Sequence, residues 1–341
     1  MSLVGIIANP SSGKDIRRLV SDATGLDNHH KANIVRRVLR GLAAISTFAQ
    51  AGPAAISHVV LMPEPAGIGH TATTGLDFPF SVAPMAMPYF GCAEDSLEAA
   101  RRLADDQADV IVVLGGDGTH RLVAKACGNI PLVPISTGTN NVWPRQNEGT
   151  LAGMAAALIA TGLVPPDTAT RRTRRLDILR DGEPFDTALV DVAACDVPVP
   201  GARAIWDVNR IRQLVLALAH PGVLGLSSIG GSLPPPTGSE RCGLALDIGD
   251  GGDTVLAPIA PGLVLPVPVR SFRWLEPGET VAITDQPGTL ALDGERETIV
   301  GRDDQLAVRL EADGPTMVDV PATLELAAGA GCFIMPTATT A

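Results

Sequence analysis

Residues 109–120 read DVIVVLGGDGTH, an apolar run that stops at a glycine-rich turn. The length of the run and its β-branched residues are typical of a buried parallel strand, and a helix is predicted to begin near Thr119. Similar strands are predicted at 3–8, 56–62 and 131–135, and amphipathic helices at 28–50 and 94–106. The alternation of strands and helices predicts a doubly wound parallel sheet.

The pattern changes after an Ala-rich helix predicted near 150–161, where Pro165-Pro166 prevents helical continuation. Downstream, short alternating or apolar runs are separated by DG, PG and GG turns. They predict a mainly antiparallel β domain with one helix, at about 203–219. We therefore expect an α/β nucleotide-binding domain over 1–165, a β-rich substrate domain over 166–325 and a C-terminal tail over 326–341.

Composition excludes several classes of protein. The chain has 341 residues, enough for two cores, and its net charge of -11 disfavours broad affinity for nucleic acid or anionic membranes. The five cysteines are far apart and form no CxxC pair, which indicates free thiols rather than a zinc site or disulfides. The N-terminus lacks a signal-peptide pattern, and Pro and Gly interrupt both long charge-free windows. We expect a cytoplasmic protein without a membrane or nucleic-acid partner.

The segment Gly115-Gly116-Asp117-Gly118-Thr119, called the glycine turn below, follows the carboxyl end of a strand, where doubly wound sheets bind ligands. Its glycines allow a phosphate to approach the main chain, and the next helix directs free N–H groups at it. The Asp117 carboxylate would repel that phosphate, so it fits a group that takes a proton from a hydroxyl or contacts Mg²⁺. A tight turn closed by an Asx hydrogen bond stays open as the alternative.

Two more polar loops follow strands of the same predicted sheet. The NPSSGK loop at 9–14 supplies hydroxyls, a glycine and an ammonium, but Ala8 stands where a Walker A loop requires glycine. The STGTNN loop at 136–141 is rich in hydrogen-bond donors. Each is also explained as an ordinary polar turn. Because parallel strands deliver their C-terminal loops to one edge, we expect the three loops to meet.

These loops carry a family resemblance. NPSSGK, LGGDGT and STGTNN, in this order, resemble the kinase superfamily that contains NAD kinases, diacylglycerol kinases and sphingosine kinases. TVLAPIAPGLVLPVPV at 254–269 is similar to the NAD kinase segment with a Pro-Ile-x-Pro-His stretch, and LALDGE at 290–295 to a later Asp-Gly turn, so the resemblance covers nearly the whole chain. GIIANPSSGKD and GGDGTHRLVAKA are most similar to the acetoin catabolism protein X branch.

The resemblance implies a two-domain enzyme of NAD-kinase-like fold that uses ATP and Mg²⁺, with NAD as a second candidate ligand. Asp117 would be the general base, and Glu295 would assist it or organise the metal, whose ligands are not identified. Homo-oligomers are common among NAD kinases, so we expect one here. The residues implied in nucleotide binding are Asn9, Gly13, Lys14, Gly115, Gly116, Gly118, Thr119, Thr137, Gly138, Thr139 and Asn140.

The second domain departs from the NAD kinase pattern. NAD kinases carry an Asn-Glu pair that recognises the dinucleotide, and the corresponding stretch here, ALVDV at 188–192, has Val190 and the shorter Asp191 instead. A site that lacks its hydrogen-bond partners can lose several orders of magnitude of discrimination, which disfavours NAD as the acceptor. The candidate substrate residues are Asp191, Thr237, Ser239 and Asp293.

Two short motifs keep alternative explanations. Asp293-Gly294-Glu295 is typical of a hairpin turn, and Asp181-Gly182-Glu183 is a second copy, so the family position alone singles out the later one. His120 falls in the first helical turn after Asp117, where it either meets a phosphate or packs in the core.

Together these features predict a phosphotransferase that moves the γ-phosphate of ATP to a hydroxyl of a small molecule, linked by resemblance to acetoin catabolism. The alternative is a non-catalytic regulatory protein that binds ATP or NAD. Release of ADP that depends on an acceptor would distinguish the enzyme from the regulator.

Overall fold

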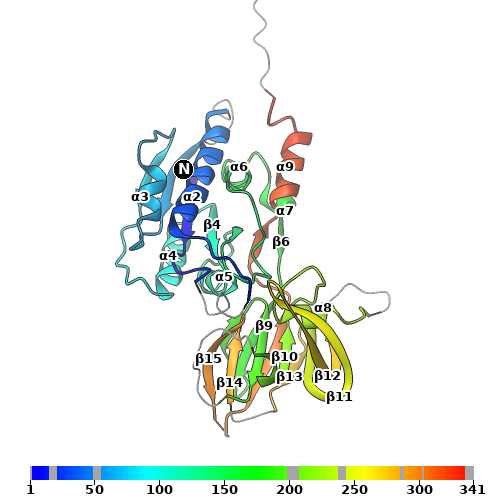
Figure 1. The fold of residues 1–341 in the computed structure, drawn as a ribbon. Helices are drawn as coiled ribbons and strands as arrows, with labels where there is room; N and C mark the ends of the chain where they lie inside the picture. The colour runs from blue at the N-terminus through cyan, green and yellow to red at the C-terminus, as the bar shows by residue number, and fades with distance from the viewer. Residues whose placement is uncertain are drawn as a thin grey trace, which may run out of the picture.

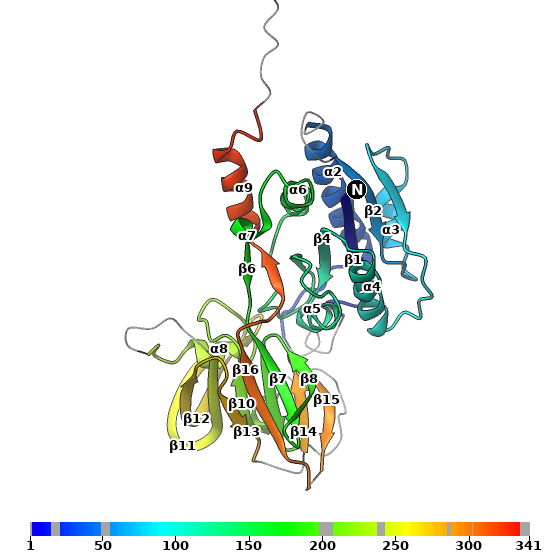
Figure 2. The same ribbon diagram turned by 180° about the vertical axis from the view of Figure 1, so that it is seen from behind.

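The fold was obtained as a computed structural model, in which an α/β half and a β half lie one above the other (Figure 1; Figure 2 shows the opposite side). The structure describes residues 2–14, 21–48, 55–197, 207–236, 243–284, 288–301 and 303–334, with the side chains of 296 and 297 left aside. Within these residues, no helix is both long and apolar enough to cross a membrane.

The α/β half is built on a seven-stranded sheet. Its central strands are buried along their whole length, as expected for parallel strands covered on both faces. All neighbouring strands run parallel except the last pair, which is antiparallel. In spatial order the strands are β3 (Ser81–Pro84), β2 (Ile56–Leu61), β1 (Ser2–Ala8), β4 (Val110–Gly115), β5 (Leu132–Ser136), β17 (Thr316–Val318) and β6 (Thr170–Arg172).

Helices cover both faces of this sheet, which confirms the doubly wound arrangement. One face carries α2 (Asn28–Phe48), α3 (Ile68–Thr73), α6 (Gly149–Ala160) and α9 (Val320–Gly329), with the short α7 (Pro166–Ala169) beside α9. The other face carries α4 (Glu94–Asp105) and α5 (Asp117–Ala124). Helices α2 and α6 pack closely because Gly153 has no side chain, since a Cβ there would lie 2.1 Å from the Val38 carbonyl oxygen.

The β half contains two antiparallel sheets with an apolar core between them. The six-stranded sheet has the order β12-β11-β10-β9-β14-β15, and the four-stranded sheet the order β13-β16-β7-β8. The strands are β7 (Arg175–Arg180), β8 (Glu183–Ala188), β9 (Asp191–Cys195), β10 (Ile211–Leu216), β11 (Gly243–Ala260), β12 (Leu263–Leu275), β13 (Thr280–Ala282), β14 (Gly288–Leu292), β15 (Glu295–Val300) and β16 (Leu306–Glu311). Helix α8 (Ser227–Gly231) packs on the outer face of the larger sheet.

The helix predicted over 203–219 is wrong. Where the structure describes this segment, it forms a 3-10 turn at Val208–Arg210 and then strand β10. In β10, which reads IRQLVL, the apolar residues Ile211, Leu214, Val215 and Leu216 are buried, and the strand pairs with β9 and β11. Three consecutive apolar residues, at 214–216, have no period that separates a strand from a helix, and here the neighbouring strands decide.

The C-terminal segment also differs from the expected tail over 326–341. Strand β17 pairs with β5 and β6, and α9 packs its Val320 and Ala327 into the core beneath α6. The segment 316–329 therefore returns to the α/β half, although it follows the β half in the sequence. Asp319 begins α9 by accepting a hydrogen bond from the Ala322 N–H at 3.2 Å, which is a typical N-cap.

Candidate functional site

The glycine turn joins β4 directly to α5, which begins at Asp117 rather than near Thr119. Glycine is required at Gly115 because a Cβ there would lie 2.4 Å from the Cβ of Thr119. The helix thus folds back tightly on the end of its strand, and its first N–H groups face the sheet edge.

The three polar loops meet at this edge. Asn9 donates its side-chain amide to Thr119 Oγ1 at 2.8 Å, which links the NPSSGK loop to the glycine turn. Thr137 Oγ1 lies 2.8 Å from Ser12 Oγ, and the Thr137 N–H donates to the Gly115 carbonyl at 3.0 Å. The sheet topology therefore produces the convergence that was expected from strand order.

Close backbone packing reinforces this convergence. A Cβ on Gly138 would lie 2.9 Å from Gly116 Cα, and a Cβ on Gly13 would lie 2.7 Å from the Thr137 carbonyl oxygen. Gly13 also has φ +73°, a conformation that favours glycine. Larger residues at these positions would separate the loops.

Lys31 is a residue of this site that the sequence analysis did not identify. It lies on α2, is completely buried, and donates to the carbonyl oxygens of Asn9, Pro10 and Ser12 at 3.0, 3.0 and 2.9 Å. Burial lowers the pKa of this ammonium to about 8, with a further contribution from Lys14. One cation thus fixes three carbonyls of the NPSSGK loop, while Lys14 itself is exposed.

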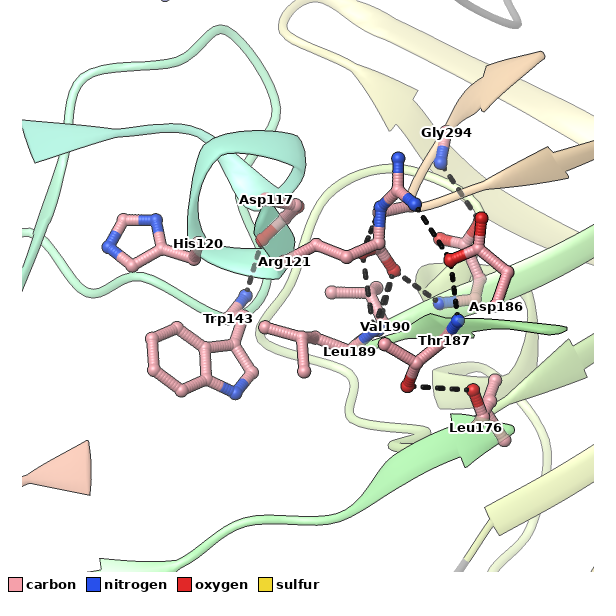
Figure 3. Close-up of polar contacts among 12 residues, drawn as sticks. Asp117, His120, Arg121, Trp143, Leu176, Asp186, Thr187, Leu189, Val190 and Gly294 are labelled. Atoms are coloured by element: carbon pink, nitrogen blue, oxygen red, sulfur yellow. Dashed lines mark hydrogen bonds and ion pairs between the residues drawn. The ribbon is translucent and has the colours of Figure 1, made fainter. Parts of the chain in front are cut away.

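Asp117 is held by the main chain of the next loop. Its carboxylate accepts hydrogen bonds from the N–H groups of Val142 at 3.0 Å and Trp143 at 2.8 Å, and the residue is 7% exposed. Figure 3 shows the contact with Trp143. These bonds fix the orientation of the carboxylate.

Asp117 also lines a pocket that is open to solvent, between the two halves of the molecule. The α/β half contributes Asp117, Asn140 and Val142, and the β half contributes Asp191, Leu224, Gly225, Leu226, Ile259, Asp293 and Gly294. Candidate residues from both predicted domains therefore share one pocket.

Asp293 and Gly294 occupy the turn between β14 and β15, as the hairpin interpretation predicted. Their φ angles of 51° and 76° are those of a type I′ turn, and Asp181 and Gly182 repeat the conformation between β7 and β8. The two copies of the motif are therefore both hairpin turns, and their surroundings distinguish them.

The Asp293 carboxylate is buried and accepts hydrogen bonds from three successive N–H groups, at Leu189, Val190 and Asp191. Burial raises the pKa of this carboxyl, while Arg121 and the three N–H groups lower it. In return, Asp191 Oδ1 accepts from the Gly294 N–H at 3.1 Å. The two aspartates thus join the turn to the start of β9.

Arg121 connects this arrangement to the glycine turn. It lies on α5, four residues after Asp117, with its side chain 2% exposed. Its Nε is 3.5 Å from Asp293 Oδ2, and its Nη1 is 3.4 Å from Asp186 Oδ1. Figure 3 draws Arg121 beside Asp186. Lys125 approaches Asp186 to 2.5 Å. The sequence did not reveal Arg121, because an arginine on a short helix normally lies in solvent.

Glu295 stands beside the start of α5. A Cβ placed on Gly118 would lie 3.7 Å from the Glu295 carboxyl group, so the two segments are in contact range. A carboxylate at the N-terminus of a helix is stabilised by the free N–H groups there. Asp117 and Glu295 therefore come from different halves of the molecule to the same helix end.

His120 packs in the core rather than facing a phosphate. It is fully buried, its Nδ1 lies 2.8 Å from the Gly116 carbonyl oxygen, and its ring is 5.1 Å from that of Trp143. Burial lowers the pKa of His120 to about 4, so the ring is neutral at pH 7. Its contacts support the glycine turn from within.

The remaining candidates are placed as follows. Asn140 donates its side-chain amide to the Ile259 carbonyl at 2.9 Å, which joins the STGTNN loop to β11. Thr139 is partly buried in the same loop. Thr237 and Ser239 lie outside the described residues. Among the residues that are described, no group of three or more His, Cys, Asp or Glu side chains is arranged to hold a metal ion.

Comparisons with known proteins agree with this geometry. Residues 4–162 match the ATP-NAD kinase N-terminal domain, and residues 174–313 match the acetoin catabolism protein X C-terminal domain. The chain is 39% identical to acetoin catabolism protein X of Cupriavidus necator over 336 residues, which cover 94% of this chain and 91% of the relative.

Among solved structures, the chain is similar to a diacylglycerol kinase from Bacillus anthracis strain Sterne, with 13% identity and a TM-score of 0.42. The similarity covers 93% of this chain and 96% of the other. A second diacylglycerol kinase structure from the same strain gives 13% identity and a TM-score of 0.47, covering 93% and 97% of the two chains.

Proposed function

Because the chain belongs to the acetoin catabolism protein X family, we propose that it transfers the γ-phosphate of ATP to a hydroxyl of a small molecule in acetoin breakdown. The observation that carries the proposal is the pocket, where the start of α5 and the STGTNN loop face Asp191 and the turn at Asp293. A donor-rich phosphate cradle on one side and a small acceptor space on the other are what phosphoryl transfer requires.

In this proposal the three loops hold the phosphates. The N–H groups at the start of α5 and the hydroxyls of Thr119 and Thr137 contribute donors, and Lys31 keeps the NPSSGK loop in shape. Lys14, exposed at the end of that loop, supplies a mobile positive charge. The cradle thereby combines fixed main-chain dipoles with one flexible cation.

Asp117 accepts the proton of the attacking hydroxyl. Two N–H groups fix the orientation of its carboxylate, and a carboxylate suffices as the base because the hydroxyl proton leaves late in a loose phosphoryl-transfer transition state. Glu295 lies close enough to orient the same hydroxyl or a bound ion.

Mg²⁺ fits this site as a companion of ATP. The ion is usually held by one or two carboxylates together with substrate phosphates, and Asp117 and Glu295 offer two carboxylates at one helix end. Bound there, it would neutralise charge on the phosphates during transfer.

The function is tested with Asp117→Asn. The amide keeps an oxygen for the N–H groups of Val142 and Trp143, so we expect ATP to bind as before, while acceptor-dependent ADP release falls by about 10² to 10⁴. Asp319→Asn is a matched control, because that aspartate also accepts a main-chain N–H but caps α9, away from the pocket. Unchanged turnover in Asp117→Asn would show that Asp117 is not the base.

A regulatory protein that binds ATP or NAD without reaction is the second candidate. The carboxylates of Asp117 and Asp293 favour this candidate, because both already accept hydrogen bonds from main-chain N–H groups and so have a structural role without catalysis. Stabilisation by ATP or NAD with no ADP released in the presence of any acceptor would support this candidate. A cytoplasmic location and a homo-oligomeric state belong to either proposal.

A further inference from the structure

The polar side chains on the described wall of the pocket are all carboxylates or amides. They belong to Asp117, Asp191, Asp293 and Asn140, and none of the described lining residues is Lys, Arg or His. The side chain of Arg121 is buried and forms ion pairs with Asp293 and Asp186. The wall is therefore electronegative, in contrast to the phosphate cradle at the opposite side of the start of α5.

Asn140 adds a neutral acceptor whose orientation is fixed. Its Nδ2 donates to the Ile259 carbonyl oxygen at 2.9 Å, and a carbonyl can only accept, so the amide cannot be turned round. The side-chain Oδ1 is left buried without a hydrogen-bond partner. A buried acceptor without a partner costs free energy, which a ligand with an N–H or O–H group would recover.

The rest of the wall is apolar. Val142 comes from the α/β half, and Leu224, Leu226 and Ile259 come from the β half. Such side chains pack against carbon rather than against water or ions. The pocket thus combines short acceptor groups with a hydrocarbon surface.

We infer that the acceptor substrate is a small uncharged diol or polyol with a short alkyl part, an inference that rests on the proposed phosphotransfer. One hydroxyl faces Asp117 and is the group that receives the phosphate. A second donates to Asn140 Oδ1, and the alkyl part packs against the leucines and Val142.

The same wall discriminates against two other compound classes. A hydroxyketone offers a carbonyl oxygen, an acceptor for which the described lining residues supply no Lys, Arg or His donor. A dinucleotide brings negative phosphates toward three aspartates, at a cost in electrostatic energy. The diol is therefore preferred over the hydroxyketone because it donates a second hydrogen bond, and over the dinucleotide because it carries no negative charge. Ligand size is a secondary factor.

The test measures the binding of four ligands to the full chain by isothermal titration calorimetry, with ADP and Mg²⁺ present. The ligands are butane-2,3-diol, glycerol, acetoin and NAD. We expect saturable binding of butane-2,3-diol, at least tenfold tighter than that of acetoin, because acetoin replaces one hydroxyl by a ketone. Tighter binding of acetoin or NAD than of both diols, or no saturable binding of either diol, overturns the inference.

Asn140→Ala tests the second contact. We expect it to weaken butane-2,3-diol binding about tenfold. Asn147→Ala is the matched control, since that amide also donates to a carbonyl, that of Pro134 at 2.8 Å, but Asn147 is not among the lining residues. Equal diol affinity in Asn140→Ala and the native chain overturns the role of Oδ1. The ligand series uses the native chain, so it decides the inference even where a variant does not fold.

Turnover separates this inference from the proposed function. If butane-2,3-diol binds but no ADP is released, the inference about the pocket stands and the phosphotransferase proposal fails. If ADP is released only with an anionic or ketone acceptor, the phosphotransferase proposal stands and the inference about the acceptor fails.

Discussion

At the scale of single residues, Lys31 shows how a buried charge can organise a loop. Its ammonium meets three carbonyl oxygens that would otherwise be turned toward the interior without donors. Burial lowers its pKa from 10.5 to about 8, with Lys14 acting in the same direction and Glu64 and Asp27 opposing. The charged form therefore costs stability that the hydrogen bonds to the loop offset.

The lowered pKa predicts a pH dependence of stability. Between pH 8 and 10.5 the unfolded chain holds a proton on Lys31 that the folded chain has lost, so the free energy of unfolding rises with pH in this window. For a shift of this size the rise is on the order of 3 kcal/mol. The sequence has one tyrosine and only two other lysines, Lys14 and Lys125, but its five cysteines also titrate near this window. Burial raises the pKa of the Cys127 thiol to about 11, which acts in the opposite direction, so the contribution of Lys31 is measured as the difference between the native chain and a variant without this lysine.

Lys31→Met should remove this rise, which urea denaturation at pH 7.5, 8.5, 9.5 and 10.5 measures. Lys125→Met is the control, because Lys125 is partly exposed beside Asp186. Parallel pH profiles for the native chain and Lys31→Met would show that Lys31 does not titrate in this range.

Sequence could identify residues whose type and position in a motif carry the signal, such as Asp117 and the glycines around it. It could not identify Lys31 or Arg121, because their roles depend on burial, and a lysine or arginine on a helix is ordinarily exposed. Asp293 was named through its family position, but only the structure shows that its carboxylate holds the main chain of 189–191.

At the scale of elements, α5 is the link between the two halves of the molecule. It begins with Asp117 in the pocket, and one turn later Arg121 reaches Asp293 on the β14–β15 turn. Because residues four apart lie on one face of a helix, a single short element fixes the position of the base relative to the opposite wall. A change at Arg121 is therefore expected to act on both halves.

Arg121→Met should destabilise the fold by about 3 to 5 kcal/mol, because it leaves Asp293 charged and buried without its cation. The double variant Arg121→Met/Asp293→Asn should regain part of this loss, since the amide oxygen still accepts the N–H groups and no charge is left buried. Chemical denaturation measures each free energy of unfolding.

The control is Arg102→Met on α4, which should lower the free energy of unfolding by less than about 1 kcal/mol. A double variant no more stable than the single one would contradict the buried pair.

The elements differ in how far they could be predicted. Strands β1, β2, β4 and β5 are mainly apolar runs followed by loops with Gly, Pro or Asn, and the sequence predicts each. Strand β10 lies in a segment that is predicted as a helix, and its state is set by hydrogen bonds to β9 and β11. Three-residue strands such as β17 carry too little sequence to predict at all.

At the scale of the whole molecule, the sequence predicted the two kinds of architecture but not the path of the chain between them. The sheet of the α/β half ends with β17 and β6, which flank the β half in the sequence and lie side by side in space. The chain therefore leaves the α/β half after β6 and returns to it at β17. Long-range pairing of this kind has no local signature in the sequence.

This return predicts that the C-terminal segment is part of the α/β fold. A chain ending at Pro315 loses β17 and α9, so it exposes the edge of β5 and removes Val318, Val320 and Ala327 from the core. We expect the α/β half to lose its cooperative thermal transition and the protein to aggregate, because an unpaired hydrophobic strand edge promotes association. A chain ending at Ile334 keeps both elements and should melt as the full chain does. Calorimetry of the three lengths measures this, and a chain ending at Pro315 that melts like the full chain would mean that α9 only lies against a domain that is stable without it.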